Sequence, residues 1–511
     1  MEWGPPSARH ELQTPSHDSD SDIEDKATSS QPLLMLAPMM DDKAGGATPA
    51  SDALELNDIG TTSSPSASLE QPNAGYGETT AYRVYKRRFF GLAQLVLLNI
   101  IVSWDWLTFA AVSTTSASFF NVSESAINWL STAFFFAFVP MVPAVIWTLN
   151  RSGPKTSILV SSALVLVGNW VRYGGTRASP PQFGVVVFGQ ILIGFSQPFV
   201  LAAPTRFSNV WFSDSGRVSA TAIATLANPL GGALGQLIGP FWATSEKHIP
   251  SMVLYTAILS TVATLPAYFI PKAPPTPPSA IAAAEKLDIR QALRELPRNR
   301  SFWLIFFPFA VYVGFFNAIS SLLNQILSPY GFSEDDAGIT GAILIVVGLV
   351  ASAIVSPIVD RKKLHLRVIK TAVPVISLSY LVFIFMPSTR SVAGPYVVAA
   401  ILGASSFSLL PATLEYLVLA THPVSPEITS TICWACGQLL GAIFVIVMNE
   451  LKGGWKGEPE KTMKSALIFQ AVIAMVVVPL PMFLGNERYG TGLSEDGMVR
   501  LQSPVNTFQV T

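Results

Sequence analysis

The sequence contains little charge and little cysteine for its length. Only 13% of its 511 residues are Asp, Glu, Lys or Arg, whereas soluble domains carry charge on about a quarter of their residues. The two cysteines, Cys433 and Cys436, cannot build a disulfide framework. A net charge of −1 and the lack of a basic tract argue against a nucleic-acid partner. Much of this chain is therefore expected to face lipid rather than water.

The sequence also lacks the motifs of common catalytic sites. It has no G-x-x-x-x-G-K phosphate-binding loop, no Ser/His/Asp spacing, and five scattered histidines. An ATP-driven pump needs that loop and a soluble domain to carry it. We therefore expect a protein that is not an enzyme, with no catalytic residue, no metal site and no cofactor.

Residues 1–80 are rich in Ser, Pro, Ala and acidic side chains, and they contain no apolar signal-peptide core. Such a composition cannot bury enough apolar surface to offset the entropy lost on ordering. We predict a disordered cytosolic tail here, and a second cytosolic tail at 486–511. Within the first tail, Gln31-Pro32-Leu33-Leu34 has the form of a dileucine sorting signal. A chance pair of leucines in a polar tail is an equally good interpretation.

Twelve apolar stretches are long enough to cross a bilayer, which takes about 20 helical residues. Six precede a polar linker at 271–300 and six follow it. We therefore predict an all-α integral membrane protein with six-helix halves at 81–270 and 301–485, joined by a cytosolic linker. The predicted spans are 89–115, 126–149, 156–174, 183–205, 219–242, 250–270, 301–327, 337–358, 367–386, 395–420, 428–450 and 465–484.

The distribution of Lys and Arg predicts the orientation, because both residues favour the cytosolic side of a membrane. Basic residues precede the first span and occupy the linker and the links after the second, fourth and eighth spans. All of these lie on one side if the N-terminus is cytosolic; only the link carrying Lys452 disagrees. The sequon at Asn121 then faces outward. The plasma membrane and a vacuolar or lysosomal membrane both remain open.

Two pairs of similar segments indicate a duplicated architecture. Asn150-Arg151-Ser152 corresponds to Asp360-Arg361-Lys362, and Gly235-Gln236-Leu237-Ile238-Gly239 corresponds to Gly437-Gln438-Leu439-Leu440-Gly441. Both pairs are a little over two hundred residues apart, the distance between equivalent helices of two halves. We assign Arg151, Asp360 and Arg361 to gating links, and the glycine faces to close helix packing.

Several polar and aromatic side chains lie inside the predicted spans. Asp105 lies in the first span, where a carboxylate is costly and therefore functional or paired. It is a candidate for taking a proton or attracting a cation, and the alternative is a passive polar lining. Glu415 in the tenth span is a second candidate for coupling or charge. Trp106 offers a π face to a cation, although a tryptophan facing lipid is the competing interpretation.

A family resemblance rests on several motifs in both halves. These are Asn128-Trp129, the Ala203–Ser213 segment with its Trp211-Phe212 pair, Ala220–Ala224, Leu230–Ala233, Ser321–Asn324, Leu410–Glu415 and Gly437-Gln438. Over residues 82–485 they resemble the major facilitator family that contains the feline leukaemia virus subgroup C receptor-related proteins and the disrupted-in-renal-carcinoma protein 2.

This resemblance implies a twelve-helix major facilitator fold and a carrier of choline- or ethanolamine-like cations, haem, or a vitamin such as pyridoxine. Trp106, Gln197 and Gln438 match a tryptophan and two glutamines that line the cavity in choline-carrying members. The tyrosine of those members falls at Asn317 or Phe309, with Tyr312 and Phe316 nearby. We take Trp106, Gln197, Gln438, Tyr312 and Asn317 as the predicted substrate-binding residues.

The sequence thus predicts a monomeric transporter, facilitative or driven by an ion gradient, that works by alternating access. Its partners would be a small-molecule solute, the lipid bilayer and, as a candidate co-substrate, protons. The competing hypothesis is a non-transporting membrane receptor or scaffold that acts through the acidic N-terminal tail. In that case deletion of residues 1–80 would abolish function, and changes at Asp105, Gln197 and Gln438 would be silent.

Overall fold

A computed structural model of the chain describes residues 83–276, 278, 294–421, 424, 426–454 and 458–485. The predicted tails, the dileucine-type segment and most of the 271–300 linker lie outside these residues.

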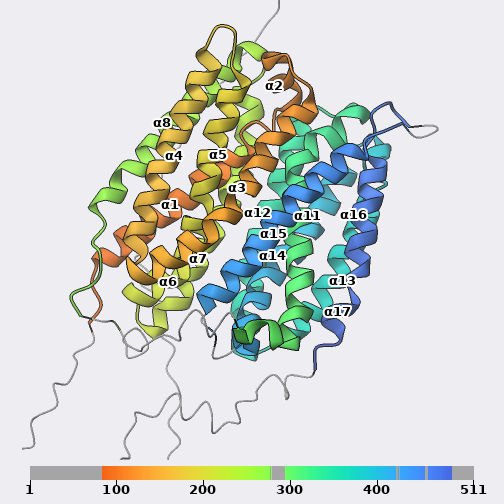
Figure 1. The fold of residues 1–511 in the computed structure, drawn as a ribbon. Coiled ribbons are helices and arrows are strands. Elements are labelled where there is room, and N and C mark those ends of the chain that lie inside the picture. The colour runs from red at the N-terminus through yellow and green to blue at the C-terminus, as the bar shows by residue number, and fades with distance from the viewer. Residues whose placement is uncertain are drawn as a thin grey trace, which may run out of the picture. The chain divides into compact units, whose positions relative to one another are not determined.

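The N-terminal half contains six long helices and two short ones, all joined by tight links (Figure 1). The long helices are α1 (Arg87–Leu107), α3 (Glu124–Arg151), α4 (Pro154–Arg177), α5 (Phe183–Leu201), α7 (Asp214–Trp242) and α8 (Ile249–Thr264). The short ones are α2 (Ser113–Phe120) and α6 (Ala203–Trp211), with 3₁₀ turns η1 (Glu246–His248) and η2 (Leu265–Phe269).

The C-terminal half repeats this arrangement. Its helices are α11 (Arg300–Leu327), α12 (Glu334–Lys362), α13 (His365–Phe383), α14 (Ala393–Thr421), α15 (Pro426–Glu450), α16 (Lys464–Val476) and the short α17 (Pro479–Met482). The 3₁₀ turns are η3 (Leu296–Arg298), η4 (Ser328–Tyr330) and η5 (Pro387–Thr389). The described residues therefore form the predicted all-helical fold with two halves of six helices.

Ten helices among the described residues are long and apolar enough to cross a membrane. The two remaining long helices, α4 and α7, are less apolar for identifiable reasons. Helix α4 carries Asn169 and Arg172 within its length, and α7 is rich in Gly, Ser and Thr. Asn169 and Arg172 are fully buried within the bundle, where other helices shield them from lipid.

The glycine faces pack equivalently in the two halves. On α7, Gly231 and Gly235 face the backbone of α1. A Cβ atom at Gly231 would overlap the carbonyl group of Ile100. On α15, Gly437 and Gly441 face Val313 and Asn317 of α11. Small residues thus allow the close helix approach that the sequence predicted, at matching places in both halves.

The halves meet where α7 contacts α12 and where α3 contacts α15. Figure 1 shows α2 at one end of the helices and α6 at the other. We call these the α2 end and the α6 end. They are the two ends from which a solute could reach the space between the halves.

The first predicted span differs from the structure. The sequence predicted one helix over 89–115, but α1 ends at Leu107 and residues 108–112 form a turn before α2 begins at Ser113. All five turn residues are buried. The turn contains neither Pro nor Gly, so local sequence gave no sign of the break.

Candidate solute-binding cavity

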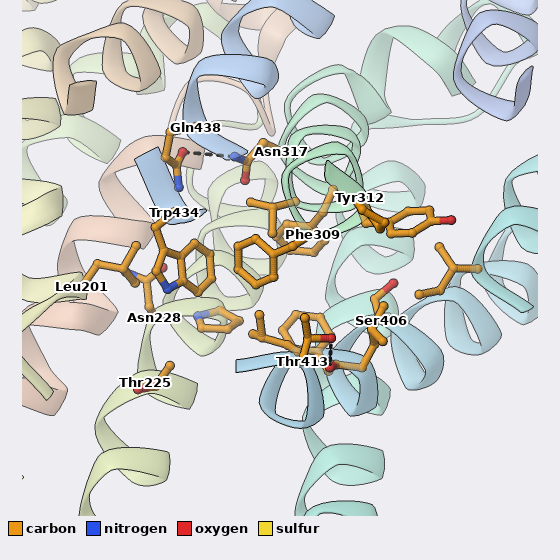
Figure 2. Close-up of a pocket in the computed structure, with 18 of the residues that line it drawn as sticks. Leu201, Thr225, Asn228, Phe309, Tyr312, Asn317, Ser406, Thr413, Trp434 and Gln438 are labelled. Carbon is orange, nitrogen blue, oxygen red and sulfur yellow. Dashed lines mark hydrogen bonds between the residues drawn. The ribbon is translucent and has the colours of Figure 1, made fainter. Parts of the chain in front are cut away.

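A cavity lies between the two halves and is walled by α1, α3, α5 and α7 on one side and by α11 to α15 and α17 on the other. Its volume is about 100 Å³. Figure 2 shows Asn317 and Gln438 at one end of the cavity and Thr225 and Thr413 at the other. Thr225 and Thr413 extend the lining toward the α6 end.

The five predicted substrate-binding residues all line this cavity. Residues more than 300 positions apart in the sequence, such as Trp106 and Gln438, therefore line one cavity. Among the described lining residues none is Asp, Glu, Lys, Arg or His. The cavity wall is thus neutral, and it consists of aromatic rings, aliphatic side chains and a few amides and hydroxyls.

Trp106 lies against two phenylalanine rings of α3. Its ring centroid is 5.2 Å from that of Phe135 and 6.3 Å from that of Phe134. The Trp106 side chain is buried, and its indole Nε1–H has no hydrogen-bond partner among the described residues. Gln197 Oε1 and Ser103 Oγ, which also line the cavity, are likewise buried without a partner. Buried polar atoms are normally hydrogen-bonded, so the hydrogen-bonding capacity of these three atoms is unmet in this conformation.

Gln438 and Asn317 form a pair on the opposite wall. Asn317 Nδ2 donates to Gln438 Oε1 at 3.0 Å. Figure 2 shows the Gln438 amide nitrogen directed away from Asn317, toward the side of Trp434. The hydrogen bond from Asn317 therefore orients the Gln438 amide so that its NH₂ group, a hydrogen-bond donor, faces the cavity.

Tyr312 contributes its ring rather than its hydroxyl. The hydroxyl lies 2.9 Å from Ser377 Oγ and donates to the carbonyl oxygen of Ala474 at 3.1 Å. In Figure 2 it points away from Phe309 and Trp434. Because its polar group is used by neighbouring helices, Tyr312 offers the cavity only an aromatic surface.

The sequence prediction missed Trp434. This residue lies one helical turn before Gln438 on α15 and lines the cavity, with its ring 5.5 Å from that of Phe309 in an edge-to-face arrangement. The i, i+4 spacing places Trp434 and Gln438 on the same helix face. That spacing is the signal from which Trp434 could have been predicted, once Gln438 was assigned to the cavity.

Asp105 is not among the described lining residues, so it does not form the passive polar lining that was the alternative interpretation of the sequence. Its side chain is fully buried within the N-terminal half. Arg172 Nη2 lies 3.1 Å from Asp105 Oδ1, and Asn169 Nδ2 donates to Asp105 Oδ2 at 2.6 Å. Successive helical residues point about 100° apart, so Asp105 faces α4 while Trp106 faces the cavity. Arg172, a charged residue inside a predicted span, was also missed.

The other predicted charge and gating residues lie elsewhere. Glu415 is exposed on α14 and is not among the described lining residues. Arg151 is the exposed last residue of α3, with its guanidinium 5.8 Å from the Trp147 ring centre. Arg361 is exposed in the last turn of α12. Asp360 belongs to the same turn, but its side chain lies outside the described residues.

A cluster that we call the α2 latch joins the halves at the α2 end. It consists of Thr114, Thr115, Asn324 and Glu334. The Glu334 carboxylate accepts from the backbone N–H of Thr114 at 3.0 Å and of Thr115 at 3.2 Å, and from Thr115 Oγ1 at 2.7 Å. Asn324 Nδ2 donates to Glu334 Oε1 at 3.2 Å. A carboxylate at a helix N-terminus also interacts favourably with the helix dipole.

Further polar contacts cross between the halves nearby. Lys452 Nζ lies 2.8 Å from Glu124 Oε2. Asn128 and Gln325 exchange two hydrogen bonds of 2.6 and 3.2 Å, and Asn128 also donates to Asn449 Oδ1 at 3.0 Å. Together with the α2 latch, these contacts close the α2 end of the cavity in this conformation.

Solved structures share this arrangement. A D-xylose–proton symporter aligns with a TM-score of 0.59 at 14% identity, over 79% of this chain and 99% of that one. A bacterial homologue of the human lysosomal transporter Spinster, in an inward-facing and unoccupied conformation, aligns with a TM-score of 0.57 at 15% identity, over 78% and 97% of the two chains. At this identity the likeness concerns the fold alone.

Two six-helix halves around a central cavity, closed by side chains at the α2 end, define a membrane transporter that works by alternating access. Residues 95–445 match the family model described as Major Facilitator Superfamily. The chain belongs to this superfamily and, within it, to solute carrier family 49. It is 33% identical to Solute carrier family 49 member A3 of Danio rerio, over 76% of this chain and 83% of that protein.

More distant relatives have a described activity. The chain is 28% identical to the choline/ethanolamine transporter FLVCR1 of Felis catus, over 77% of this chain and 72% of that protein. It is 26% identical to the choline/ethanolamine transporter flvcr2b of Danio rerio, over 73% and 80% of the two chains. The suspected family is therefore confirmed.

Proposed function

We propose that this transporter carries a small organic cation of the choline or ethanolamine class through the cavity between its halves. The observation that carries the proposal is a neutral cavity with a tryptophan on each wall, Trp106 from α1 and Trp434 from α15. Aromatic faces attract a cation by about 0.5–2 kcal/mol each, most strongly where water is excluded. A quaternary ammonium group has no N–H to donate, so aromatic faces suit it better than polar groups do.

The hydrogen-bonding atoms of the cavity suit the other end of such a solute. Gln197 Oε1, Trp106 Nε1 and Ser103 Oγ are unpaired among the described residues, and together they can both accept and donate. A hydroxyl group, which donates once and accepts twice, matches this set. Choline and ethanolamine each carry one hydroxyl beside their cationic group.

The size of the cavity supports a small solute over haem. A cavity of about 100 Å³ is small, and choline and ethanolamine suit it better than haem, which is several times larger than either. Pyridoxine is intermediate in size and serves as the competitor in a test.

The driving force that the cavity supports best is the membrane potential. The described lining residues contain no carboxylate or imidazole that could carry a coupling proton. A monovalent cation gains about 2.3 kcal/mol per 100 mV of membrane potential, which drives uptake without a second ion. With the tails on the cytosolic side, the closed α2 end is the outer end, and the solute leaves toward the cytosol.

Flux measurements in proteoliposomes test the proposal. Labelled choline and ethanolamine are offered under an inside-negative potassium diffusion potential, and separately under a pH gradient, with pyridoxine as competitor. We expect saturable uptake that follows the potential and not the pH gradient. If neither gradient produces flux of choline, ethanolamine or pyridoxine above that of empty liposomes, this proposal fails and the result supports the receptor or scaffold hypothesis.

A tryptophan substitution tests the cavity assignment. Trp106→Ala removes one aromatic face and is expected to weaken apparent choline affinity 10- to 100-fold, which corresponds to about 1.4–2.8 kcal/mol. Trp147→Ala is the matched control, because Trp147 is 57% exposed on α3 and does not line the cavity. Equal affinity in both variants would remove Trp106 from the binding site.

A further inference from the structure

Helix α1 ends beside the cavity, deep within the N-terminal half. The last carbonyl groups of any helix lack intrahelical partners, and without water they must bond to other protein groups. Trp106 lies in this last turn, one residue before the helix ends at Leu107. Whatever satisfies the end of α1 therefore also fixes the direction of Trp106.

Arg172 of α4 bonds to one of these last carbonyl groups, that of Asp105, whereas Thr108 Oγ1 and the Ala111 N–H bond to those of Trp104 and Leu107. Arg172 Nη1 donates to the Asp105 backbone carbonyl at 2.9 Å, and its Nη2 lies 3.1 Å from Asp105 Oδ1. Its guanidinium also lies 5.5 Å from the ring centre of Phe109, in the turn that follows α1. A single side chain thus contacts both the end of α1 and the turn after it.

Two amide side chains complete the fully buried group. Gln190 accepts from Arg172 Nη1 at 2.7 Å and itself donates to the Asp105 carbonyl at 3.3 Å. Asn169 accepts from Arg172 Nη2 at 2.9 Å and donates to Asp105 Oδ2 at 2.6 Å. The planar guanidinium fork suits this set of acceptors, whereas a lysine ammonium could not bond to them with the same geometry.

A buried ion pair is seldom kept for stability alone, because well-packed apolar residues often do as well or better. Here Arg172 also bonds to the backbone carbonyl of Asp105, so the ion pair holds the main chain of α1 as well as the Asp105 side chain. Holding Asp105 against α4 turns the next residue, Trp106, toward the cavity. Helix α4 itself contributes none of the described lining residues, so Arg172 can influence the cavity only through the helices it contacts, which are α1 at Asp105 and α5 at Gln190.

We propose that Arg172 is a positioning residue for transport: it fixes the last turn of α1, and through Asp105 it holds Trp106 in the cavity wall. Asp105 is then the anchor by which α1 is held, rather than a proton carrier. Which solute Trp106 contacts depends on the proposed function, but the positioning of Trp106 does not.

A thiol-accessibility experiment tests the positioning without any solute. Cys433→Ser and Cys436→Ser remove both native cysteines, and Trp106→Cys places one thiol in the cavity wall. We expect this thiol to react with a small water-soluble thiosulfonate, and the rate to fall at least fivefold when Asp105→Asn and Arg172→Gln are added together. That double change removes both charges and keeps similar shapes. An unchanged rate in a protein of normal gel-filtration profile would overturn the proposal.

Arg172→Lys provides a second variant in case the double variant does not fold. It retains the positive charge that Asp105 needs and loses the fork that reaches the Asp105 carbonyl. We expect a smaller fall in the reaction rate of the introduced thiol, about twofold or more. A rate equal to that of the parent would show that charge alone is required, which contradicts the positioning role.

Choline transport by the Asp105→Asn, Arg172→Gln variant provides the functional readout. We expect KM to rise about tenfold, and Trp106→Ala to add little on this background, because residues that act as a unit are not additive. A fall in Vmax with unchanged KM would mean that the pair only maintains the fold. A pH-dependent KM that disappears in Asp105→Asn would make Asp105 a proton site; both results overturn the proposal. If the thiol result holds but no choline moves, the proposed function fails and the positioning stands.

Discussion

Replacing Glu334 by Gln is expected to loosen the α2 end of the transporter. Glu334 reaches from α12 in the C-terminal half to the first residues of α2 in the N-terminal half, and four hydrogen bonds converge on its carboxylate. Gln has almost the same shape but no charge, and one of its two terminal atoms is a donor. The substitution therefore weakens the α2 latch without creating a cavity.

The size of the effect follows from these contacts. Hydrogen bonds to a charged group contribute about 1.5–3 kcal/mol and neutral ones about 0.5–1.5 kcal/mol. Glu334 is only partly buried, so solvent screens part of the charge effect. A net loss of about 1–2 kcal/mol remains, which shifts the ratio of closed to open conformations at the α2 end by about 5- to 30-fold.

Fluorescence transfer across the α2 end measures this ratio. Dyes are attached through Glu246→Cys in the N-terminal half and Ser391→Cys in the C-terminal half, with both native cysteines replaced by serine; both sites are exposed. We expect Glu334→Gln to increase the population with low transfer. Asp335→Asn is the matched control, because Asp335 is exposed in the same helical turn and loses the same charge.

A transfer distribution for Glu334→Gln that is identical to that of the parent protein would refute the reasoning. The result would mean that the α2 end is held by the Lys452–Glu124 and Asn128–Gln325 contacts, and that the Glu334 contacts are incidental. A shift of equal size in Asp335→Asn would refute it as well, because the effect would then come from overall charge at the α2 end.

Three further predictions concern other contacts. Lys452→Glu should speed exchange at the α2 end, and adding Glu124→Lys should largely restore the parent transfer distribution, because the reversed pair can re-form; failure of this rescue would mean that the pair contributes nothing. Gly231→Ala should lower the melting temperature of detergent-solubilised protein, because the added Cβ atom would overlap the backbone of α1. Such overpacking costs about 1–3 kcal/mol. A melting curve like that of the parent would contradict close packing of α7 against α1. Asn317→Leu should raise the choline KM severalfold by freeing Gln438, and an unchanged KM would show that Gln438 needs no orientation.

A control for the glycine prediction is available on α4. Gly174 has no atom within 4 Å of the position that a Cβ would take. Gly174→Ala should therefore leave the melting temperature unchanged or raise it slightly, since alanine is the better helix former. Equal losses at Gly174 and Gly231 would mean that helix propensity or expression, rather than the α1 contact, governs the result.

The sequence predicted the helices well because apolar length is a local property. A run of about 20 apolar residues is helical in lipid wherever it occurs, so both halves could be predicted without knowing how they pack. The break at 108–112 could not, because Thr-Phe-Ala-Ala-Val continues the apolar pattern without a helix breaker. Arg172 and Gln190, from two other helices, bond to the carbonyl of Asp105 just before that break.

The candidate site was predictable only in part, for a similar reason. The resemblance placed Trp106, Gln197 and Gln438 at the cavity because their motifs can be matched position by position. Only its i, i+4 spacing from Gln438 distinguishes Trp434 from a lipid-facing tryptophan such as Trp147, since both lie in apolar helices. Which face of a helix meets the cavity depends on how the halves pack, and a single sequence does not contain that information in local form.

Access of water to one cavity residue from both sides of the membrane tests the central claim most directly. Ser406 lines the cavity from α14 and resembles cysteine in size. Ser406→Cys, in a protein without the native cysteines, therefore places one thiol in the cavity wall with little change in packing. With an impermeant thiol reagent, the account predicts modification from the α6 side in the parent protein, and increased modification from the α2 side once Glu334→Gln is added. A thiol that stays unreactive from both sides in either protein would contradict an alternately accessible cavity.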